Sequence, residues 1–263
     1  MLECQKQNDL TMKTITNFLL VLALLMLLPN LSAHNLKQSI ESEDRTPAYV
    51  SRDVYRHPFE TLSFFGIKPD MTVVELNPGG GWYTEILANY IHYPGTLITA
   101  QGDYYLENFK KKMNSDPMYG RVEIVGLNSS IAEINSIDAV LTFRNLHNWL
   151  GPQMDSIFRS SFKALKPGGI FGIVEHRAKK GTDLEAMKKS GYVTEEHAIE
   201  VALKNGFELV EKAEINANPK DTKDHPRGVW TLPPRLRLNE VDREKYESIG
   251  ESDRMTLLFR KPL

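Results

Sequence analysis

The feature that most constrains the fold is an apolar run that ends in a glycine turn, between residues 71 and 86. Residues 71–76 carry β-branched and aliphatic side chains, as is typical of an interior strand in a parallel sheet. Gly79 and Gly81 follow, and glycine permits positive φ angles and a close approach of a ligand to the main chain. Residues 82–90 are predicted to form a helix whose first N–H groups point back at the turn. The stretch predicts a site for a nucleotide-like ligand, with a tight turn that binds nothing as the alternative.

Beyond this turn, the chain alternates short apolar runs with helical patterns. This alternation predicts an α/β fold built on a doubly wound, mostly parallel sheet. The last two predicted strands have no helix between them, so we expect the final strand to run antiparallel. Residues 166–169, Lys-Pro-Gly-Gly, are predicted to turn into the fifth strand. The other strands are expected at residues 95–100, 121–125, 137–143, 170–174, 207–215 and 255–260, and the other helices at residues 57–66, 103–114, 152–165 and 194–205.

The composition is that of an ordinary globular protein. The 263 residues are 41% hydrophobic and 25% charged, which suits one α/β domain with an extension. The formal net charge of −2 gives no support for nucleic acid as a partner. The single cysteine, Cys4, lies near the N-terminus, so neither a disulfide nor a thiol catalyst is expected in the domain.

Residues 1–33 are predicted to be a signal peptide. Their apolar core at residues 18–28 is followed by Ala33, a small residue suited to a cleavage point. The core is short for a membrane span, which needs about 20 apolar residues. We therefore expect an exported protein, periplasmic or secreted, that begins near His34 and keeps no membrane span. An anchor that is not cleaved is the alternative, and the true start is left open between the first methionine and Met12.

The glycine turn differs from a dinucleotide fingerprint, because Glu85 stands where the third glycine is required. The pattern Glu75-x-Asn77-x-Gly79-x-Gly81 instead resembles motif I of class I S-adenosylmethionine (SAM) methyltransferases. Asn77 replaces the first glycine of that motif, and asparagine tolerates the left-handed conformation better than most residues.

Later stretches of the chain carry the same resemblance. Residues 138–149 are similar to motif IV of the family, and residues 165–169 to the approach to its motif V. The resemblance implies a Rossmann-like, seven-stranded methyltransferase domain over residues 34–263, with SAM as its cofactor. Segments 218–221, 228–234 and 250–255 resemble a group of exported bacterial proteins of this family without a known substrate.

Two segments lie outside the expected sheet. Residues 34–66 are an N-terminal arm and helix, and the part up to residue 56 is either solvated or folded over the cofactor, as in many members of the family. Residues 216–253 separate the last two strands and contain four prolines, which argues against regular structure. If the sixth strand is parallel to the sheet, this insertion leans over the acceptor site.

The resemblance implies that the cofactor lies on the glycine turn and on the ends of neighbouring strands. Gln101 stands where the family usually has an acid for the ribose hydroxyls, and its amide oxygen can still accept their hydrogen bonds. Leu127 or Asn128 stands at the position of the usual adenine-contacting acid. The expected cofactor-binding residues are Glu75, Asn77, Gly79, Gly81, Tyr83, Gln101, Asp103, Asn128, Arg144 and Asn145.

Methyl transfer depends mainly on alignment, and a base helps when the acceptor is a hydroxyl or a protonated amine. Ligands of open α/β sheets bind at the carboxyl ends of strands, so the candidates follow the fourth and fifth strands. His147 and His176 are the candidate bases, with capping of a helix as the alternative for His147. The candidate substrate-binding residues are Asn148, Trp149, Glu175, Arg177, Asp221, His225 and Trp230.

Two of these assignments have an alternative in which the residues have only a structural role. Glu175 and Arg177 could form only a surface ion pair, which stabilises little. The insertion could pack on the sheet edge or on a partner subunit. The sequence has no histidine pair at helical spacing and no cysteine ligand set, so we expect no metal site.

The function predicted first is SAM-dependent methyl transfer to a small-molecule acceptor that the sequence does not identify. The alternative is a catalytically silent protein on the same fold that binds a nucleotide or nucleoside. Export and the substitutions at Gln101 and Leu127 favour this alternative, because SAM is made inside cells. A nicotinamide oxidoreductase is the weakest hypothesis, since Glu85 stands where the dinucleotide fingerprint requires a glycine. The oligomeric state is not predicted.

Overall fold

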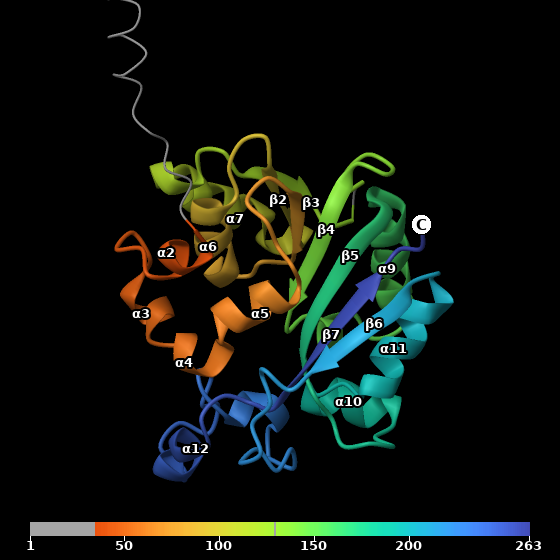
Figure 1. Cartoon of the computed structure of the whole chain (residues 1–263). Helices are drawn as coiled ribbons and strands as arrows, with labels where there is room; N and C mark the ends of the chain where they lie inside the picture. The colour runs from red at the N-terminus through yellow and green to blue at the C-terminus, as the bar shows by residue number, and fades with distance from the viewer. Residues whose placement is uncertain (1–34, 129) are drawn as a thin grey trace, which may run out of the picture. The chain divides into compact units, whose positions relative to one another are not determined.

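The computed structural model describes residues 35–128 and 130–263 (Figure 1). The predicted signal peptide lies outside the described residues, so its cleavage and the export of the protein stay predictions. Among the residues that are described, the structure contains no helix that is both long enough and apolar enough to cross a membrane.

The domain is built on one seven-stranded sheet with the strand order β3-β2-β1-β4-β5-β7-β6 (Figure 1). Strands β1 to β5 pair in parallel, whereas β7 runs antiparallel to both of its neighbours. This confirms the prediction of a mostly parallel, Rossmann-like methyltransferase sheet with an antiparallel last strand. The strands are β1 (Thr72–Leu76), β2 (Thr96–Gln101), β3 (Glu123–Gly126), β4 (Ile137–Phe143), β5 (Leu165–His176), β6 (Glu208–Ala213) and β7 (Arg254–Arg260).

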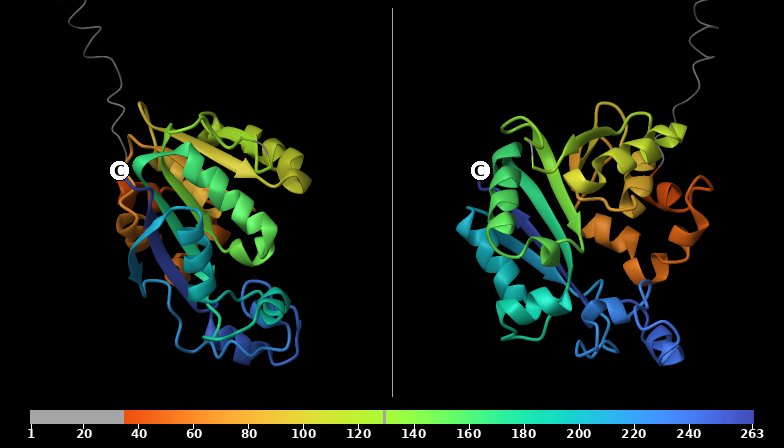
Figure 2. Two further views of the ribbon diagram at one scale, coloured as in Figure 1. Left: turned by 90° about the vertical axis from the view of Figure 1, so that its right-hand side faces the viewer. Right: turned by 180° about the vertical axis from the view of Figure 1, so that it is seen from behind.

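Helices cover both faces of the sheet (Figure 2). On one face lie α2 (Leu36–Ile40), α5 (Pro58–Phe64), α6 (Trp82–Tyr90) and α7 (Asp103–Asn114). On the other lie α8 (Leu146–Trp149), α9 (Pro152–Ala164), α10 (Leu184–Ser190) and α11 (Glu195–Lys204). The other helices of the described residues are α3 (Pro47–Val50), α4 (Asp53–Arg56), α12 (Arg243–Ile249) and the short 3₁₀ turns η1 (Pro117–Tyr119) and η2 (Gly228–Thr231).

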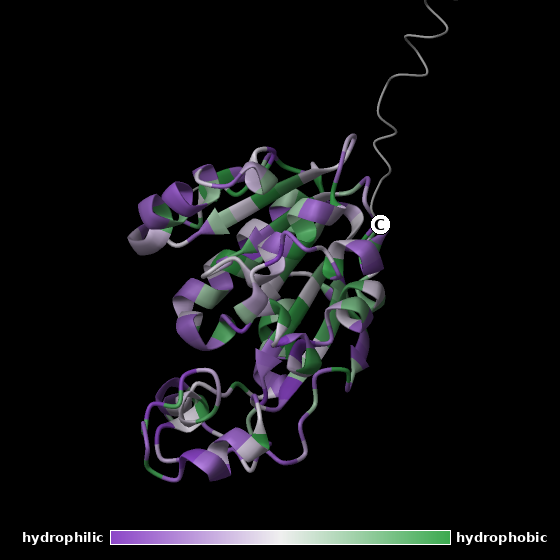
Figure 3. Cartoon of the chain, turned by 90° about the vertical axis from the view of Figure 1, so that its left-hand side faces the viewer, coloured by the Kyte–Doolittle hydropathy of each residue, from purple (hydrophilic) through white to green (hydrophobic). Residues whose placement is uncertain are grey.

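The central strands are apolar on both faces because both faces are covered. Val73 packs against the helices of one face and Val74 against those of the other, as the alternation of side chains in a strand requires. In β4, Leu141 packs on the same face as Val73, and Val140 packs on the same face as Val74. Colouring by hydropathy shows the apolar residues along these strands and the polar ones on the outer sides of the helices (Figure 3).

Three local predictions need correction. Residues 166–169 form no turn before β5 but belong to the strand, because β4 and β5 pair with a register shift between Ile137 and Ala139 that absorbs the extra residues. The helix predicted at residues 57–66 is shorter, because His57 has a positive φ of 42° and separates α4 from α5. The insertion at residues 216–253 is partly regular, since it contains η2 and α12.

The N-terminal arm packs on the glycine turn. The main-chain N–H of Thr46 and its hydroxyl both donate to Glu85 of α6, at 3.0 and 2.6 Å. The hydroxyl of Tyr49 donates to the carbonyl of Gly80 at 2.8 Å, and Trp82 donates its indole N–H to the carbonyl of Tyr49 at 2.9 Å. The arm therefore lies against the glycine turn, and its folding over the cofactor stays a prediction.

Candidate active site

A cleft of about 1280 Å³ opens at the carboxyl ends of β1 and β4. The strand order reverses between these two strands, and ligands of open α/β sheets bind at such a switch point. Pockets for one small ligand usually measure about 300–1,000 Å³, so the cleft has room for two. The predicted site residues that line it are Asn77, Gly79, Gln101, Asp103, Asn128, Arg144, Asn145, His147, Asn148, Trp149, His176 and Trp230.

The glycine turn forms one wall of the cleft. Gly79 has a φ of 62°, and a Cβ atom at this position would meet no other atom within 4 Å, so the space beside it is open. Gly81 has a φ of 86° and is the N-cap residue of α6, but it does not belong to the lining. Asn77 adopts a φ of 48°, the left-handed conformation expected of it.

A pair of asparagines joins the strand ends below the turn. The side-chain amide of Asn77 donates to Asn145 Oδ1 at 2.9 Å. Asn145 in turn donates to the carbonyl groups of Leu76 and Asn77, both at 3.1 Å, and is buried. These bonds tie the end of β1 to the end of β4, so both asparagines shape the floor of the cleft.

Two predicted cofactor residues lie behind the turn instead of in the lining. Glu75 is buried and accepts a 2.6 Å hydrogen bond from the hydroxyl of Thr84, which joins β1 to α6. Burial raises the pKa of Glu75 to about 7. Tyr83 stacks on Phe143 with ring centroids 3.5 Å apart and donates its hydroxyl to the carbonyl of Arg56 at 3.3 Å. In this structure both residues hold the turn in place.

The far end of the cleft, at β2 and β3, fits the ribose and base of a nucleoside. Within the described part of the chain, the side-chain oxygen of Gln101 is buried and accepts no hydrogen bond. A buried acceptor without a donor is unfavourable, and a ribose hydroxyl would supply one. Asn128 donates to Asp103 Oδ2 at 2.8 Å, which holds both side chains at the edge of the cleft. Leu127 offers an apolar surface in place of the usual acid.

The opposite end of the cleft contains a histidine held by a buried carboxylate. His147 Nδ1 lies 3.0 Å from Glu175 Oε1, and Glu175 is fully buried. A carboxylate accepts hydrogen bonds, so Nδ1 carries the proton and Nε2 is left as the basic atom. Glu175 also accepts hydrogen bonds from the main-chain N–H groups of Leu146 and His176, which fix its orientation. Glu175 therefore positions His147 from behind the lining.

His176 lies next to His147, with ring centroids 5.3 Å apart. Its Nδ1 is 2.5 Å from the hydroxyl of Ser252, at the end of the insertion. Burial, and then the nearby His147 and three arginines, lower the pKa of His176 well below its ordinary value. His176 is therefore neutral at neutral pH.

Within the described residues, His147, Glu175 and His176 also form a group whose potential metal-ligand atoms lie within 4.8 Å of one another. Sequence spacing did not reveal this group, because the residues come from α8 and β5. Both oxygens of Glu175 already accept hydrogen bonds, and three arginines place positive charge near His176. This positive charge disfavours the binding of a divalent cation. The absence of a metal site stays a prediction.

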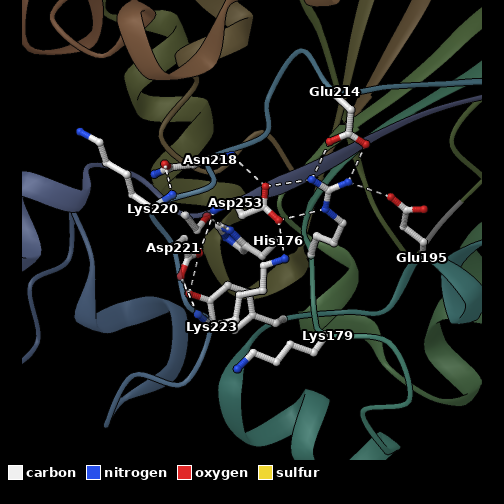
Figure 4. Close-up of polar contacts among 12 residues, drawn as sticks. His176, Lys179, Glu195, Glu214, Asn218, Lys220, Asp221, Lys223 and Asp253 are labelled. Carbon is white, nitrogen blue, oxygen red and sulfur yellow. Dashed lines mark hydrogen bonds and ion pairs between the residues drawn. The ribbon is translucent and has the colours of Figure 1, made fainter.

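Arg177, Asp221 and His225 lie outside the lining, in a polar network linked through Asp253. Figure 4 shows Asp221 and Asp253 of this network together with Glu195 and Glu214. The Arg177 guanidinium donates to Asp253 at 2.9 Å and to Glu214 at 2.7 and 2.8 Å, and a further bond reaches Glu195. Asp221 accepts from Tyr192, from His225 and from the main-chain N–H of Asp253. These bonds fix the ends of the insertion, and the substrate role predicted for the three residues stays a prediction.

Sequence reasoning missed several residues of the lining. Arg52 and Arg56 come from the arm, and Glu251 and Ser252 come from the end of the insertion. The charged character of the arm was visible in the sequence, but no motif connects it to a segment about 200 residues away. Tyr49, also from the arm, is a further residue of the lining.

Comparisons with known proteins identify the fold. No protein-family model matches the chain. The chain is 26% identical over 202 residues to the sterol 24-C-methyltransferase erg-4 of Neurospora crassa, a match that covers 70% of this chain but only 51% of that protein. The chain therefore spans about half the length of this curated relative.

Solved structures with the same fold include methyltransferases and also the [4+2]-cyclase SpnF, which is 17% identical with a TM-score of 0.57 over 87% of this chain and 92% of that one. A SAM-dependent methyltransferase from Aquifex aeolicus is 18% identical, with a TM-score of 0.53, and the match covers 70% of this chain and 94% of that one. Phosphoethanolamine N-methyltransferase 2 of Haemonchus contortus, in complex with phosphomonomethylethanolamine and S-adenosylhomocysteine, is 17% identical, with a TM-score of 0.53. That match covers 88% of this chain and 61% of the other. The chain thus has the Rossmann-like fold of the SAM-dependent methyltransferases.

Proposed function

We propose that this protein transfers a methyl group from SAM to a small-molecule acceptor. The observation that carries the proposal is the cleft itself, which joins the glycine turn and the unpaired oxygen of Gln101 to the His147–Glu175 pair. One end has the groups that a nucleoside cofactor requires, and the other has an oriented base. The fold and its known relatives support the same function.

The residues of this chain would divide the work between binding and proton transfer. Gln101, Asp103 and the main chain at Gly79 would hold the cofactor, which supplies an electrophilic methyl group when it is bound. His147 Nε2 would take the proton of an acceptor hydroxyl as its oxygen attacks that methyl group, or the proton of an ammonium before its nitrogen attacks. The acceptor gains the bond to the methyl carbon, the carbon–sulfur bond breaks, and S-adenosylhomocysteine is the leaving group. Glu175 would keep His147 in the correct tautomer and stabilise the imidazolium that forms.

His147 is a better candidate for the base than His176. Glu175 holds His147 through Nδ1 and leaves Nε2 as the atom that can accept a proton, whereas burial, His147 and nearby arginines lower the pKa of His176. We propose that His176 helps to position the acceptor. A silent binding protein on this fold is not favoured, because a cleft that only binds a nucleoside needs no oriented histidine–carboxylate pair.

Calorimetry tests the cofactor assignment directly. The purified chain should bind SAM and its product S-adenosylhomocysteine, and it should not bind NAD under the same conditions. Binding of NAD in preference to both SAM and S-adenosylhomocysteine would contradict the proposal, because the glycine turn would then serve a dinucleotide.

Once an acceptor is identified, His147→Ala should lower kcat by about 100-fold or more, the range expected for loss of a general base. Affinity for S-adenosylhomocysteine should be unchanged, because His147 lies at the opposite end of the cleft from Gln101. The variant His197→Ala, on α11 and outside the lining, is the control. Equal turnover in His147→Ala and the parent would show that alignment alone drives the reaction.

A further inference from the structure

Four arginines surround one carboxylate at the edge of the cleft. Glu251 lies 2.7 Å from Arg52 Nε, 3.3 Å from Arg56 Nε and 3.7 Å from Arg144 Nη1, and it also contacts Arg254. We call these five residues the arginine cluster. Four positive charges against one negative charge leave the cluster with an excess of three positive charges.

The cluster is assembled from distant parts of the chain. Arg52 and Arg56 come from the arm, Arg144 follows β4, Glu251 ends the insertion and Arg254 begins β7. All of them except Arg254 line the cleft. The side chain of Arg56 is 5% exposed and that of Glu251 is 4% exposed, so water screens their charges poorly.

Among the described residues, no carboxylate other than Glu251 forms an ion pair with the four arginines. Burial and the neighbouring arginines lower the pKa of Arg56 to about 8, and burial lowers that of Arg144 to about 10. The carboxyl group of Glu75 also acts on Arg144, but it is buried, bonded to Thr84 and has a raised pKa. A bound anion would remove this unfavourable excess.

Arg144 has donors available for such an anion. Among the residues that the structure describes, its guanidinium makes no hydrogen bond, and its contact with Glu251 is an ion pair at 3.7 Å. Its backbone has a φ of 62°, which is uncommon for a residue with a side chain. Its side chain is 22% exposed, on the lining of the cleft.

The cluster adjoins the proposed base. Ser252, next to Glu251, contacts His176, and His176 contacts His147. An anion held by Arg144 would thus lie beside the two histidines, on the far side of the switch point from Gln101.

We propose, on the basis of the function proposed above, that the methyl acceptor carries a phosphate or another doubly charged anionic group, held by Arg52, Arg56 and Arg144 beside His147. Guanidinium groups bind phosphate through paired hydrogen bonds as well as through charge. A dianion matches the excess of three charges better than the amino-acid end of the cofactor does, because that end carries one carboxylate and one ammonium group.

Inorganic phosphate is the probe for this site. Calorimetry should show that phosphate binds to protein already saturated with S-adenosylhomocysteine. Arg144→Gln and Arg52→Gln should each weaken phosphate binding by about tenfold or more, since each removes charge-assisted hydrogen bonds. Arg159→Gln, an exposed arginine on α9 that loses the same charge, should have no effect. Both cluster arginines chosen are partly exposed, and melting curves check that the variants fold.

Three results would overturn the proposal. If phosphate displaces S-adenosylhomocysteine, or if Arg144→Gln weakens the binding of S-adenosylhomocysteine as much as that of phosphate, the cluster serves the carboxylate of the cofactor. If phosphate binds as well to Arg144→Gln as to Arg159→Gln, the cluster is no anion site. If the parent does not bind phosphate at all, the acceptor carries no such group. Failure to bind S-adenosylhomocysteine would instead contradict the proposed function, so the two failures are distinguishable.

Discussion

At the scale of single residues, the glycine turn shows how conformation and space act together. Gly79 and Gly66 have similar φ angles of 62° and 67°, and a Cβ atom at either position would meet nothing within 4 Å. They differ in place, because Gly79 lines the cleft and Gly66 does not. Substitution of each glycine therefore separates the loss of stability caused by backbone strain from the loss of ligand affinity.

Gly79→Ala and Gly66→Ala should each destabilise the fold by about 1–2 kcal/mol, because both place a side chain in the left-handed region. Only Gly79→Ala should weaken S-adenosylhomocysteine binding, by about tenfold or more, equivalent to about 1.4 kcal/mol. Calorimetry and thermal unfolding of the two variants measure both effects. Equal ligand affinity in the two variants would show that the turn does not contact the cofactor.

The raised pKa of Glu75 predicts how the stability of the fold depends on pH. Its pKa is about 7 in the folded protein against an ordinary value of 4.5, so protonation favours the folded state. This contribution to stability is fully present below about pH 4.5 and is lost as the pH rises through about 7. Relative to the parent, Glu75→Gln should therefore gain stability as the pH rises from 5 to 8, by up to about 3 kcal/mol.

Chemical unfolding of both proteins at several pH values measures this difference. Exposed Glu60→Gln, on α5, is the control and should follow the parent at every pH. Parallel curves for Glu75→Gln and the parent would show that the buried carboxyl titrates normally.

At the scale of elements, the insertion between β6 and β7 completes the cleft. Strand β6 runs in the same direction as β5, since both are antiparallel to β7, so the insertion starts at the edge of the sheet where the cleft lies. Trp230 of η2 reaches the lining, 6.0 Å from the ring of His147, and Arg237 stacks on it at 4.8 Å. This agrees with the expected position of the insertion, and its role in acceptor binding remains a proposal.

Two tryptophans of the lining should respond differently to truncation. Trp149 is 3% exposed and packs in the main core, so Trp149→Ala should destabilise the fold by about 3–5 kcal/mol. Trp230 is only partly buried, so Trp230→Ala should change the melting temperature much less and leave S-adenosylhomocysteine affinity unchanged. A drop in melting temperature as large as that of Trp149→Ala would place Trp230 among the core residues.

At the scale of the whole molecule, ionic networks join segments that the sheet alone does not hold. Arg177, directly after β5, binds Asp253 before β7, Glu214 after β6 and Glu195 of α11. The guanidinium thus connects three elements and the end of the insertion.

Arg177→Met should lower the free energy of unfolding by about 2 kcal/mol, between the value for an exposed ion pair and that for a buried one. Urea unfolding measures this change, and Arg243→Met, which removes exposed helix pairs, should have an effect below about 0.5 kcal/mol. Because Arg177 lies outside the lining, S-adenosylhomocysteine affinity should be unchanged. A lower affinity would show that the network also shapes the cleft.

The sequence by itself determined the elements whose signals are local. The helix at Trp82–Tyr90 and the strand at Ile137–Phe143 have the predicted bounds, because caps, turns and periodicity act over a few residues. The glycine turn selected Gly79, the methyltransferase resemblance selected Gln101, and the rule that ligands bind at strand ends selected His147. The structure places all three in one cleft.

Only the tertiary structure decided which distant side chains meet. The strand pairing of residues 166–169 depends on β4, and the contacts of Arg52 and Arg56 with Glu251 join positions about 200 residues apart. Such contacts depend on how the arm and the insertion pack around the sheet, and no local pattern in the chain records that packing.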